Sequence, residues 1–414
     1  KIQPCEPPAK LHAFRHYSPI HSVMAAWDRA ARALVLASAL VLPRMAPLCE
    51  ARMLRAGRPR QQGQAAFAVV RPFWAEELPG LAETLLAPCA PRACEHGPLP
   101  VDLVLYYAES ASDRAAGNLS STVDQVLRTL VPLLEKDPCY RGVRVEYAGI
   151  GSAVPYPASP CTQFVDMFTE PAAPLWGYSA VYQMELDIRP LREGWLQRLL
   201  PAMKQAAGGE VWVVGGVYNL KCMVGSDNRT LWQQKIDEGV QASEIKRGGE
   251  WWNNRHINGN AVYSSSPEFV TWVRDTWGRR QGGPKDVFDR CKQQGGYDEL
   301  MYLEAQGMPG GAARWREDKS FMDCKPVGDH KAARTLSARR LREAFAAAQL
   351  VHASEDFPRD ERRSEDCKPA GASAHDRVLA MAEIGALVQA ALPTARRAGS
   401  DAGPRGGRSF YLSF

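Results

Sequence analysis

Hydrophobic runs of strand length alternate with helical segments through the middle of the chain. Strands are predicted over residues 65–70, 101–107 and 143–150, of which the second is a nearly continuous apolar run typical of a strand buried on both faces. Residues 76–86 and 120–134 carry apolar side chains at helical spacing. Strands that alternate with helices of this length predict an α/β fold with a mostly parallel sheet flanked by helices.

The alternation continues downstream. The pattern predicts a strand over 178–191, a helix over 193–207, a strand over 210–218 and a helix over 267–279. A connection that contains prolines and a cysteine is expected over residues 151–174, before the next strand.

Both ends of the 414-residue chain differ in composition from this middle part. We expect an N-terminal stem or accessory helix over 1–64, a single catalytic domain over 65–355 and a C-terminal tail, partly disordered, over 356–414. The apolar run 33–42 is about half a membrane span, which favours a buried helix over an anchor. A membrane contact is therefore expected only through an anchor upstream of Lys1.

Charge and cysteine content narrow the class of protein. The net charge is only +5 and no basic stretch is interleaved with aromatic residues, which argues against nucleic-acid binding.

The ten cysteines form no CxxC pair, so zinc sites of the usual spacing are absent, and sequons occur at Asn118 and Asn228. Together the cysteines and the sequons favour an oxidising secretory lumen. Two local disulfides are predicted, Cys89 with Cys94 and Cys139 with Cys161.

The strand predicted over 178–191 carries two carboxylates, Glu185 and Asp187, one residue apart. In a strand both would point to the same side, roughly 7 Å apart. Carboxylates at the end of a buried strand need a positive partner, and a hard divalent cation carrying phosphate oxygens is a common one. Pairing with Arg189 or Arg192 is the alternative.

Further candidates lie near other strand ends. Ligands of parallel sheets bind outside the carboxyl ends of the strands, where Arg71, Tyr106 and Tyr107 are expected. His352 ends a short apolar piece and is a candidate metal ligand, although a lone histidine is usually structural.

Asp298 and Glu299 open a predicted helix, where acids also act as a favourable N-terminal cap. Amides, imidazoles and aromatic faces suit sugars, and these gather at Trp252, His256, Asn258, Gly259 and Asn260.

Taken in order, residues 65–354 resemble a GT-A-fold, nucleotide-sugar-dependent glycosyltransferase, with a Rossmann-type sheet. Glu185-Leu186-Asp187 looks like the DxD element of that family with Glu at the first acidic position. Residues 256–263 are similar to its asparagine-and-glycine strand, Tyr297-Asp298-Glu299 to its second acidic motif, and Val351-His352 to its late histidine.

The resemblance implies that Asp187, with Glu185 directly or through water, and His352 bind Mn²⁺ or Mg²⁺ bridging a nucleoside diphosphate sugar, the donor. It also implies that Asp298 or Glu299 faces a hydroxyl acceptor on a glycan or glycoprotein, as base if the enzyme inverts or as an orienting group if it retains. The alternatives are a sugar nucleotidyltransferase and a non-catalytic carbohydrate-binding protein that keeps the fold. The nucleotidyltransferase is disfavoured because residues 71–74 are not a Gly-rich basic loop.

Overall fold

The computed structural model divides the chain into a unit of residues 1–62 and a unit of residues 63–414. All residues that can be described belong to the second unit. They are residues 67–86, 90–108, 118–150, 158–169, 177–241, 257–277, 301–302, 305–325, 332–353, 379, 382–384 and 386–387. The stem predicted over 1–64 and most of the predicted tail lie outside these residues.

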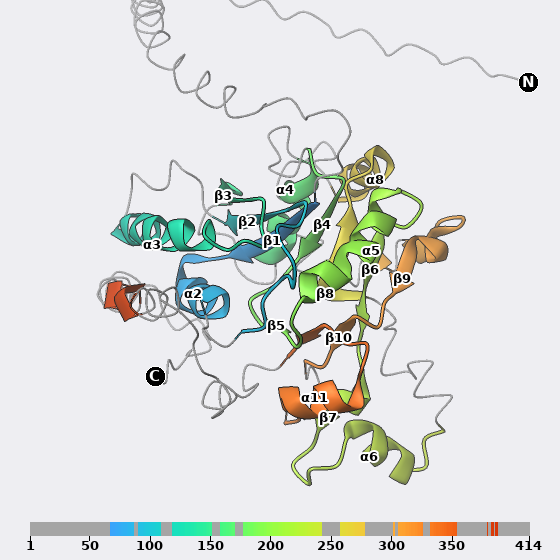
Figure 1. Ribbon diagram of the computed structural model, residues 1–414. Coiled ribbons are helices and arrows are strands. Elements are labelled where there is room, and N and C mark those ends of the chain that lie inside the picture. Colours follow the sequence, from blue (N-terminus) through green and yellow to red (C-terminus); the bar gives the residue numbers. More distant parts are fainter. Residues whose placement is uncertain are drawn as a thin grey trace, which may run out of the picture. The chain divides into compact units, whose positions relative to one another are not determined.

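A seven-stranded sheet forms the centre of the described part, in the order β3-β2-β1-β4-β8-β6-β9 (Figure 1). Its strands are β1 (Phe67–Phe73), β2 (Val101–Tyr107), β3 (Gly142–Tyr147), β4 (Ala180–Gln183), β6 (Val213–Val217), β8 (Ile257–Ser264) and β9 (Trp315–Glu317). β3, β2, β1 and β4 are parallel, β8 is antiparallel to β4 and β6, and β9 is parallel to β6. The predicted α/β fold with a mostly parallel sheet is confirmed.

Helices cover both faces of this sheet. On one face α2 (Leu78–Leu86), α3 (Asn118–Leu134) and α5 (Trp195–Ala207) bury their apolar stripes in one core cluster. On the other face α4 (Ala158–Thr169) and α8 (Pro267–Trp277) pack in a second cluster. The described part of the chain therefore has the layers helix, sheet, helix, because each parallel strand must bury two apolar faces.

Helix α4 lies within the segment 151–174, which the sequence pattern identified only as a connection, so this helix was not predicted. Several prolines precede or open the helix, where proline is tolerated, and they obscured its apolar spacing. The ring centroids of Phe164 and Phe168 lie 4.9 and 6.1 Å from that of Tyr263 in β8. These aromatic contacts fix α4 on the sheet.

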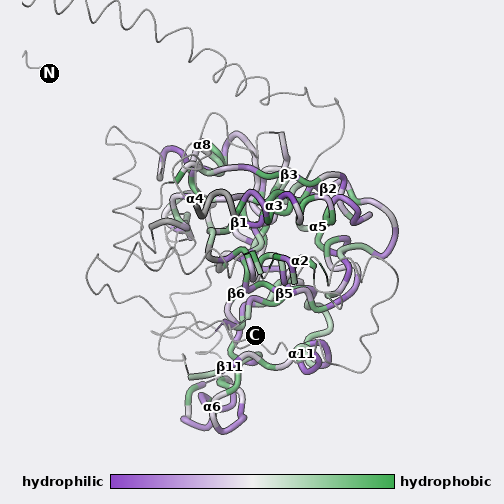
Figure 2. The backbone as a smooth tube through the Cα atoms, turned by 90° about the vertical axis from the view of Figure 1, so that its left-hand side faces the viewer, coloured by the Kyte–Doolittle hydropathy of each residue, from purple (hydrophilic) through white to green (hydrophobic). Residues whose placement is uncertain are grey.

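Two smaller sheets are separate from the central sheet. One has the order β10-β12-β5, and the other pairs β11 with β7. Their strands are β5 (Ile188–Pro190), β7 (Met223–Val224), β10 (Phe321–Asp323), β11 (Arg334–Thr335) and β12 (Leu350–His352). The short helices near them are η3 (Leu220–Cys222), α6 (Leu231–Asp237) and α11 (Ala338–Ala344). The remaining short helices are η1 (Ala75–Glu77) and η4 (Gly311–Arg314). Figure 2 shows α11 mainly hydrophilic, and only its buried residues join the third apolar cluster.

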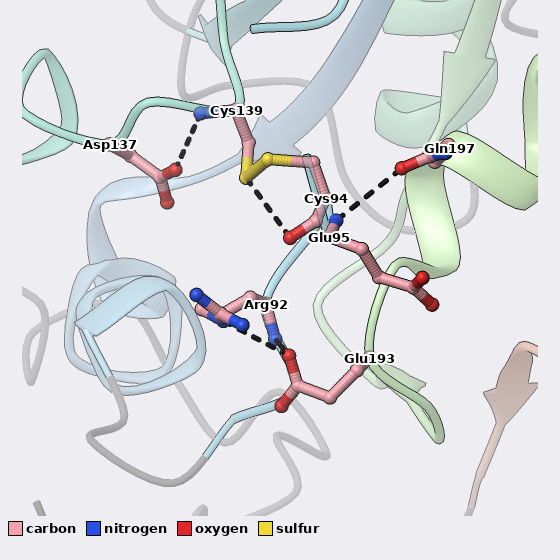
Figure 3. The surroundings of a disulfide bond; sticks show 7 residues. All are labelled: Arg92, Cys94, Glu95, Asp137, Cys139, Glu193 and Gln197. Atoms are coloured by element: carbon pink, nitrogen blue, oxygen red, sulfur yellow. Dashed lines mark hydrogen bonds and ion pairs between the residues drawn. A yellow bond between two sulfur atoms is a disulfide. The ribbon is translucent and has the colours of Figure 1, made fainter. Parts of the chain in front are cut away.

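The disulfides differ from the predicted pairs. Cys94 is bonded to Cys139, which excludes both Cys89–Cys94 and Cys139–Cys161 (Figure 3). The bond joins the segments that lead into β2 and β3, and Arg92 nearby forms an ion pair with Glu193 at 3.3 Å. Neighbouring parallel strands bring their leading segments together, which sequence proximity does not reveal. A second disulfide joins Cys222 to Cys324.

Asp102 lies near the amino end of β2, at the opposite end of the strand from its carboxyl end. Its side chain is 2% exposed and accepts two hydrogen bonds from Arg141, at 2.8 and 2.6 Å, and one from the Tyr178 hydroxyl at 2.7 Å. Burial, followed by the hydrogen bond to Asp102, raises the pKa of Tyr178. These bonds tie β2 to the segments that precede β3 and β4.

We expect Asp102→Asn to lower the free energy of unfolding by ~2–3 kcal/mol, because a buried charged acceptor is lost while the arginine stays partly solvated. Denaturant unfolding with an unchanged m value measures this change. Asp275→Asn on α8, where the aspartate is exposed, is the matched control and should change stability by less than ~0.5 kcal/mol. Equal stability of the two variants would contradict the prediction.

Part of the predicted tail packs on the domain. Ile384 is 1% exposed and belongs to the same core cluster as α2, α3 and α5. Among the described helices, none combines the length and apolar character needed to cross a bilayer.

Candidate active site at the switch point of the sheet

The order of strands changes direction between β1 and β4. β2 and β3 add to one side of β1, whereas β4 pairs with its other side. In open α/β sheets, ligands bind outside the carboxyl ends of the strands at such a switch point. Arg71 lies near the carboxyl end of β1, and Glu185 and Asp187 follow β4. Three of the predicted binding residues therefore belong to this edge.

Glu185 and Asp187 lie in the turn that joins β4 to β5. The continuous strand predicted over 178–191 is instead two short strands, because β4 ends at Gln183. The Ile188 amide donates a hydrogen bond to the Glu185 carbonyl at 3.1 Å and closes the turn. In the turn both carboxylates keep contact with solvent, with side chains 29% and 20% exposed.

His352 reaches the same turn from far downstream in the chain. β12 pairs with β5 so that His352 lies opposite Ile188. Its Nε2 is 3.1 Å from Asp187 Oδ1 and 3.7 Å from Glu185 Oε2. One ligand atom from each of the three residues lies within 4.8 Å of the others. An imidazole and two carboxylates form a donor set that suits a divalent cation such as Mn²⁺.

Asp323 holds the other side of the His352 ring. The two residues are opposite each other in the parallel pair β10–β12, and Asp323 Oδ1 is 3.4 Å from His352 Nδ1. A carboxylate behind a histidine ligand fixes the ring and leaves Nε2 for the metal. Burial alone would lower the pKa of His352, but Asp187 and Asp323 raise it well above its ordinary value, so a metal at Nε2 would have to displace a proton.

Lys325 already supplies a positive charge to Asp187. Its Nζ forms an ion pair with Asp187 Oδ2. Burial would raise the pKa of Asp187, but His352 and Lys325 hold it well below its usual range. For Lys325 the effects have the opposite sign. Burial would lower its pKa, but Asp187 and Glu185 raise it. Asp187 is therefore a carboxylate, as a metal ligand must be.

The two arginines considered as partners of the acids have other contacts. Arg189 donates to the carbonyls of Leu186 and Ile188 within the turn. Arg192 donates to the carbonyls of Arg342, at 2.6 Å, and Ala348, at 3.0 Å. Arg192 thereby fixes the segment that leads into β12, and hence the position of His352.

Gly259 and Asn260 in β8 lie against this group of residues. A Cβ atom on Gly259 would stand 2.8 Å from the Glu185 carboxyl carbon, so the glycine leaves the space that the carboxylate occupies. Gly259 has a φ of 31°, which also favours glycine. The fully buried Asn260 accepts a hydrogen bond from the Tyr182 hydroxyl at 2.7 Å. Sugar binding by these two residues stays a prediction.

Arg71 is a fully buried cation. Its three guanidinium nitrogens have no hydrogen-bond partner among the described residues. Burial, followed by repulsion from Arg189, lowers its pKa to about 10, although Asp187 is among the groups that oppose the shift. Burying a charge without hydrogen bonds costs free energy, and an anion bound at Arg71 would relieve that cost.

The predicted tyrosines lie on opposite faces of β2. Tyr106 belongs to the core cluster of α4 and α8, and Tyr107 to that of α2, α3 and α5. Both are 1% exposed. Two side chains on opposite faces do not contact one ligand together, and a role in donor binding stays a prediction for each.

Other predicted site residues lie outside the described part of the chain. These are Trp252, His256, Asp298 and Glu299. Asn258 belongs to β8, but its side chain is not among those described.

Sequence reasoning missed Asp323 and Lys325. Phe321-Met322-Asp323 is a short apolar run that ends in an acid, the same signal that singled out Asp187. Its position beside β12 depends on strand pairing between distant segments, which the local pattern does not contain.

We expect His352→Ala to raise the Mn²⁺ concentration needed for half-maximal nucleotide binding by ~100-fold or more, because loss of a partner behind a ligand already costs 10–100-fold. Calorimetric Mn²⁺ titration in the presence of nucleoside diphosphate measures this shift. His96→Ala, at an exposed histidine, is the matched control. Identical titrations for His352→Ala and the unaltered protein would remove His352 from the site.

Comparison with solved structures finds proteins that act on sugars. Mouse xyloside xylosyltransferase 1 in its apo form is 13% identical, with 71% of this chain and 99% of that chain covered and a TM-score of 0.34. The galactosyltransferase LgtC with donor and acceptor sugar analogs is 12% identical, with 76% and 95% covered and a TM-score of 0.33. The Mn/GDP form of core-mannan synthase A from Aspergillus fumigatus is 8% identical, with 64% and 75% covered and a TM-score of 0.32.

The xylosyltransferase and the galactosyltransferase are named as glycosyltransferases, the class that the sequence resembles. At these TM-scores and identities the likeness does not assign an activity. The activity is therefore inferred from the chain's own site. No family model and no curated protein matches the chain.

Proposed function

We propose that this chain is a metal-dependent glycosyltransferase of the GT-A type. It would transfer a sugar from a nucleoside diphosphate sugar to a hydroxyl group of a glycan or glycoprotein. Mn²⁺ or Mg²⁺ would be the cofactor.

The observation that carries the proposal is the convergence of Glu185, Asp187 and His352 at the switch point, with ligand atoms within 4.8 Å of one another. The residues come from two chain segments more than 160 residues apart, so chance adjacency in sequence does not explain the group. The space left by Gly259 and the buried carboxylate of Asp323 behind His352 support the same reading.

The chain's own residues have distinct tasks in such a reaction. A divalent cation, when bound, supplies stabilisation for the negative charge that appears on the diphosphate as the sugar–phosphate bond breaks. Glu185, Asp187 and His352 would hold that cation. Arg71 offers a fixed positive charge near the same edge. Asp298 or Glu299 would orient or deprotonate the acceptor hydroxyl, which is a poor nucleophile alone.

One observation favours a second candidate, a carbohydrate-binding protein without catalysis. Lys325 already neutralises Asp187, so the acids have a partner in the protein itself. Such a protein would bind sugars without nucleotide and without metal.

We also propose a secretory-pathway location, in the Golgi lumen. The disulfides Cys94–Cys139 and Cys222–Cys324 support an oxidising compartment. The sequon residue Asn228 is exposed and precedes α6, which suits attachment of a glycan.

A panel of nucleotide sugars tests the proposed activity. Each donor is incubated with the protein and Mn²⁺, Mg²⁺ or a chelator, and release of nucleoside diphosphate is measured. We expect slow, metal-dependent hydrolysis of one donor or a few related ones. Absence of donor hydrolysis and of nucleotide binding with every metal would refute the transferase, and sugar binding under those conditions would favour the second candidate.

A further inference from the structure

Both oxygens of Asp187 are engaged before any metal enters. Oδ2 is paired with the ammonium of Lys325, and Oδ1 lies 3.1 Å from His352 Nε2. Lys325 therefore occupies the place of a counter-ion at the residue that the proposed function assigns as the main metal ligand.

The surrounding charge makes simultaneous occupation unfavourable. Arg71 and Arg189 lie close enough for their charges to interact, and the charge of Asp187 acts on Arg71 as well. A divalent cation would add two positive charges beside these arginines and Lys325. At short range, like charges repel strongly where water is partly excluded. Glu185 and Asp323 offset part of this repulsion. The ammonium and the metal still compete for the same carboxylate, so metal should bind Asp187 more tightly once the ammonium has left.

The Lys325 side chain has room to move away from Asp187, whereas the Arg71 side chain is enclosed. The Lys325 side chain is 34% exposed and ends a flexible four-carbon stem, while Arg71 is fully buried. The backbone beside Lys325 is fixed, because the Cys324 amide donates to the His352 carbonyl at 2.8 Å and Cys324 is bonded to Cys222. The side chain can therefore swing while its attachment stays in place.

We propose that Lys325 is a resident cation that competes with the divalent metal for Asp187, so that metal binds weakly until a nucleoside diphosphate accepts the displaced ammonium. This inference rests on the proposed function and adds to it a coupling between metal and nucleotide. The diphosphate brings the negative charge that both the metal and the released lysine need, so each ligand should strengthen the binding of the other.

The test measures Mn²⁺ binding without nucleotide, by calorimetry and by the electron paramagnetic resonance signal of free Mn²⁺. We expect Lys325→Met to bind Mn²⁺ about tenfold tighter than the unaltered protein, equivalent to ~1.4 kcal/mol. Lys325→Arg, which keeps the charge, should retain weak binding. Lys319→Met, at an exposed lysine that precedes β10, is the matched control and should leave Mn²⁺ binding unchanged.

A second arm measures UDP and GDP binding at saturating Mn²⁺, where Lys325→Met should bind the nucleotide more weakly because the released ammonium is missing. Unchanged or weaker Mn²⁺ binding by Lys325→Met, with its thermal unfolding unaltered, would overturn the inference. So would a Lys325→Arg variant that binds Mn²⁺ as tightly as Lys325→Met. Failure of the unaltered protein to bind either nucleotide with any metal would count against the proposed function instead, because the first arm does not use nucleotide.

Discussion

Asp187→Asn should reduce glycosyl transfer by about three orders of magnitude or more. The substitution keeps the shape of the side chain but removes the charge that faces His352 and Lys325. Loss of one preorganised group that stabilises developing charge already costs 10²–10³-fold in turnover, and loss of a metal ligand removes a larger contribution. Nucleotide binding in the presence of Mn²⁺ should fall to the level measured with a chelator.

Turnover of the preferred donor and thermal unfolding are measured on the same preparation. Asp237→Asn on α6 is the control, since that carboxylate is exposed and far from β4 in the sequence. Activity of Asp187→Asn within tenfold of the unaltered protein, with Asp237→Asn also active, would contradict the assignment.

Arg71→Met should weaken nucleoside diphosphate binding while leaving the protein equally or more stable. A hydrogen bond to a charged group contributes ~1.5–3 kcal/mol, so we expect a 10–100-fold loss of affinity. The pKa of Arg71 is lowered to about 10, which means that folding disfavours its charged form, on the order of 3 kcal/mol. Methionine fills similar space without that cost.

Calorimetry with UDP and GDP, together with denaturant unfolding, separates these two effects. Arg128→Met on the exposed side of α3 is the matched control and should alter neither quantity. If Arg71→Met lost several kcal/mol of stability and bound nucleotide unchanged, Arg71 would be a structural residue and the anion site would be wrong.

Local patterns sufficed for the layers of the fold. The apolar run of β2 coincides with its predicted bounds, and α3 begins two residues before the predicted helix, because buried parallel strands and amphipathic helices each leave a clear period. Helix α4 was missed since prolines at its start look like a loop. The antiparallel direction of β8 was not predicted, because direction depends on the path of the chain rather than on composition.

The candidate site was predictable only in part. Glu185 and Asp187 could be predicted because they are acids at the end of an apolar run. His352 was assigned to the site through the resemblance to a family. Asp323 and Lys325 escaped notice because they reach the site through the pairing of β10 with β12. Burial of Arg71 was not predicted either, since the sequence does not show that the side chain of an arginine near the end of a strand points into the core.

In the proposed site, Glu185, Asp187 and His352 bind a single cation beside the diphosphate of the donor. A crystal grown with Mn²⁺ and nucleoside diphosphate, with anomalous scattering recorded for manganese, examines it directly. We expect one manganese peak at ~2 Å from an Asp187 oxygen and from His352 Nε2, next to the phosphates. A peak bound by other residues, or bound nucleotide with no manganese at these side chains, would contradict it.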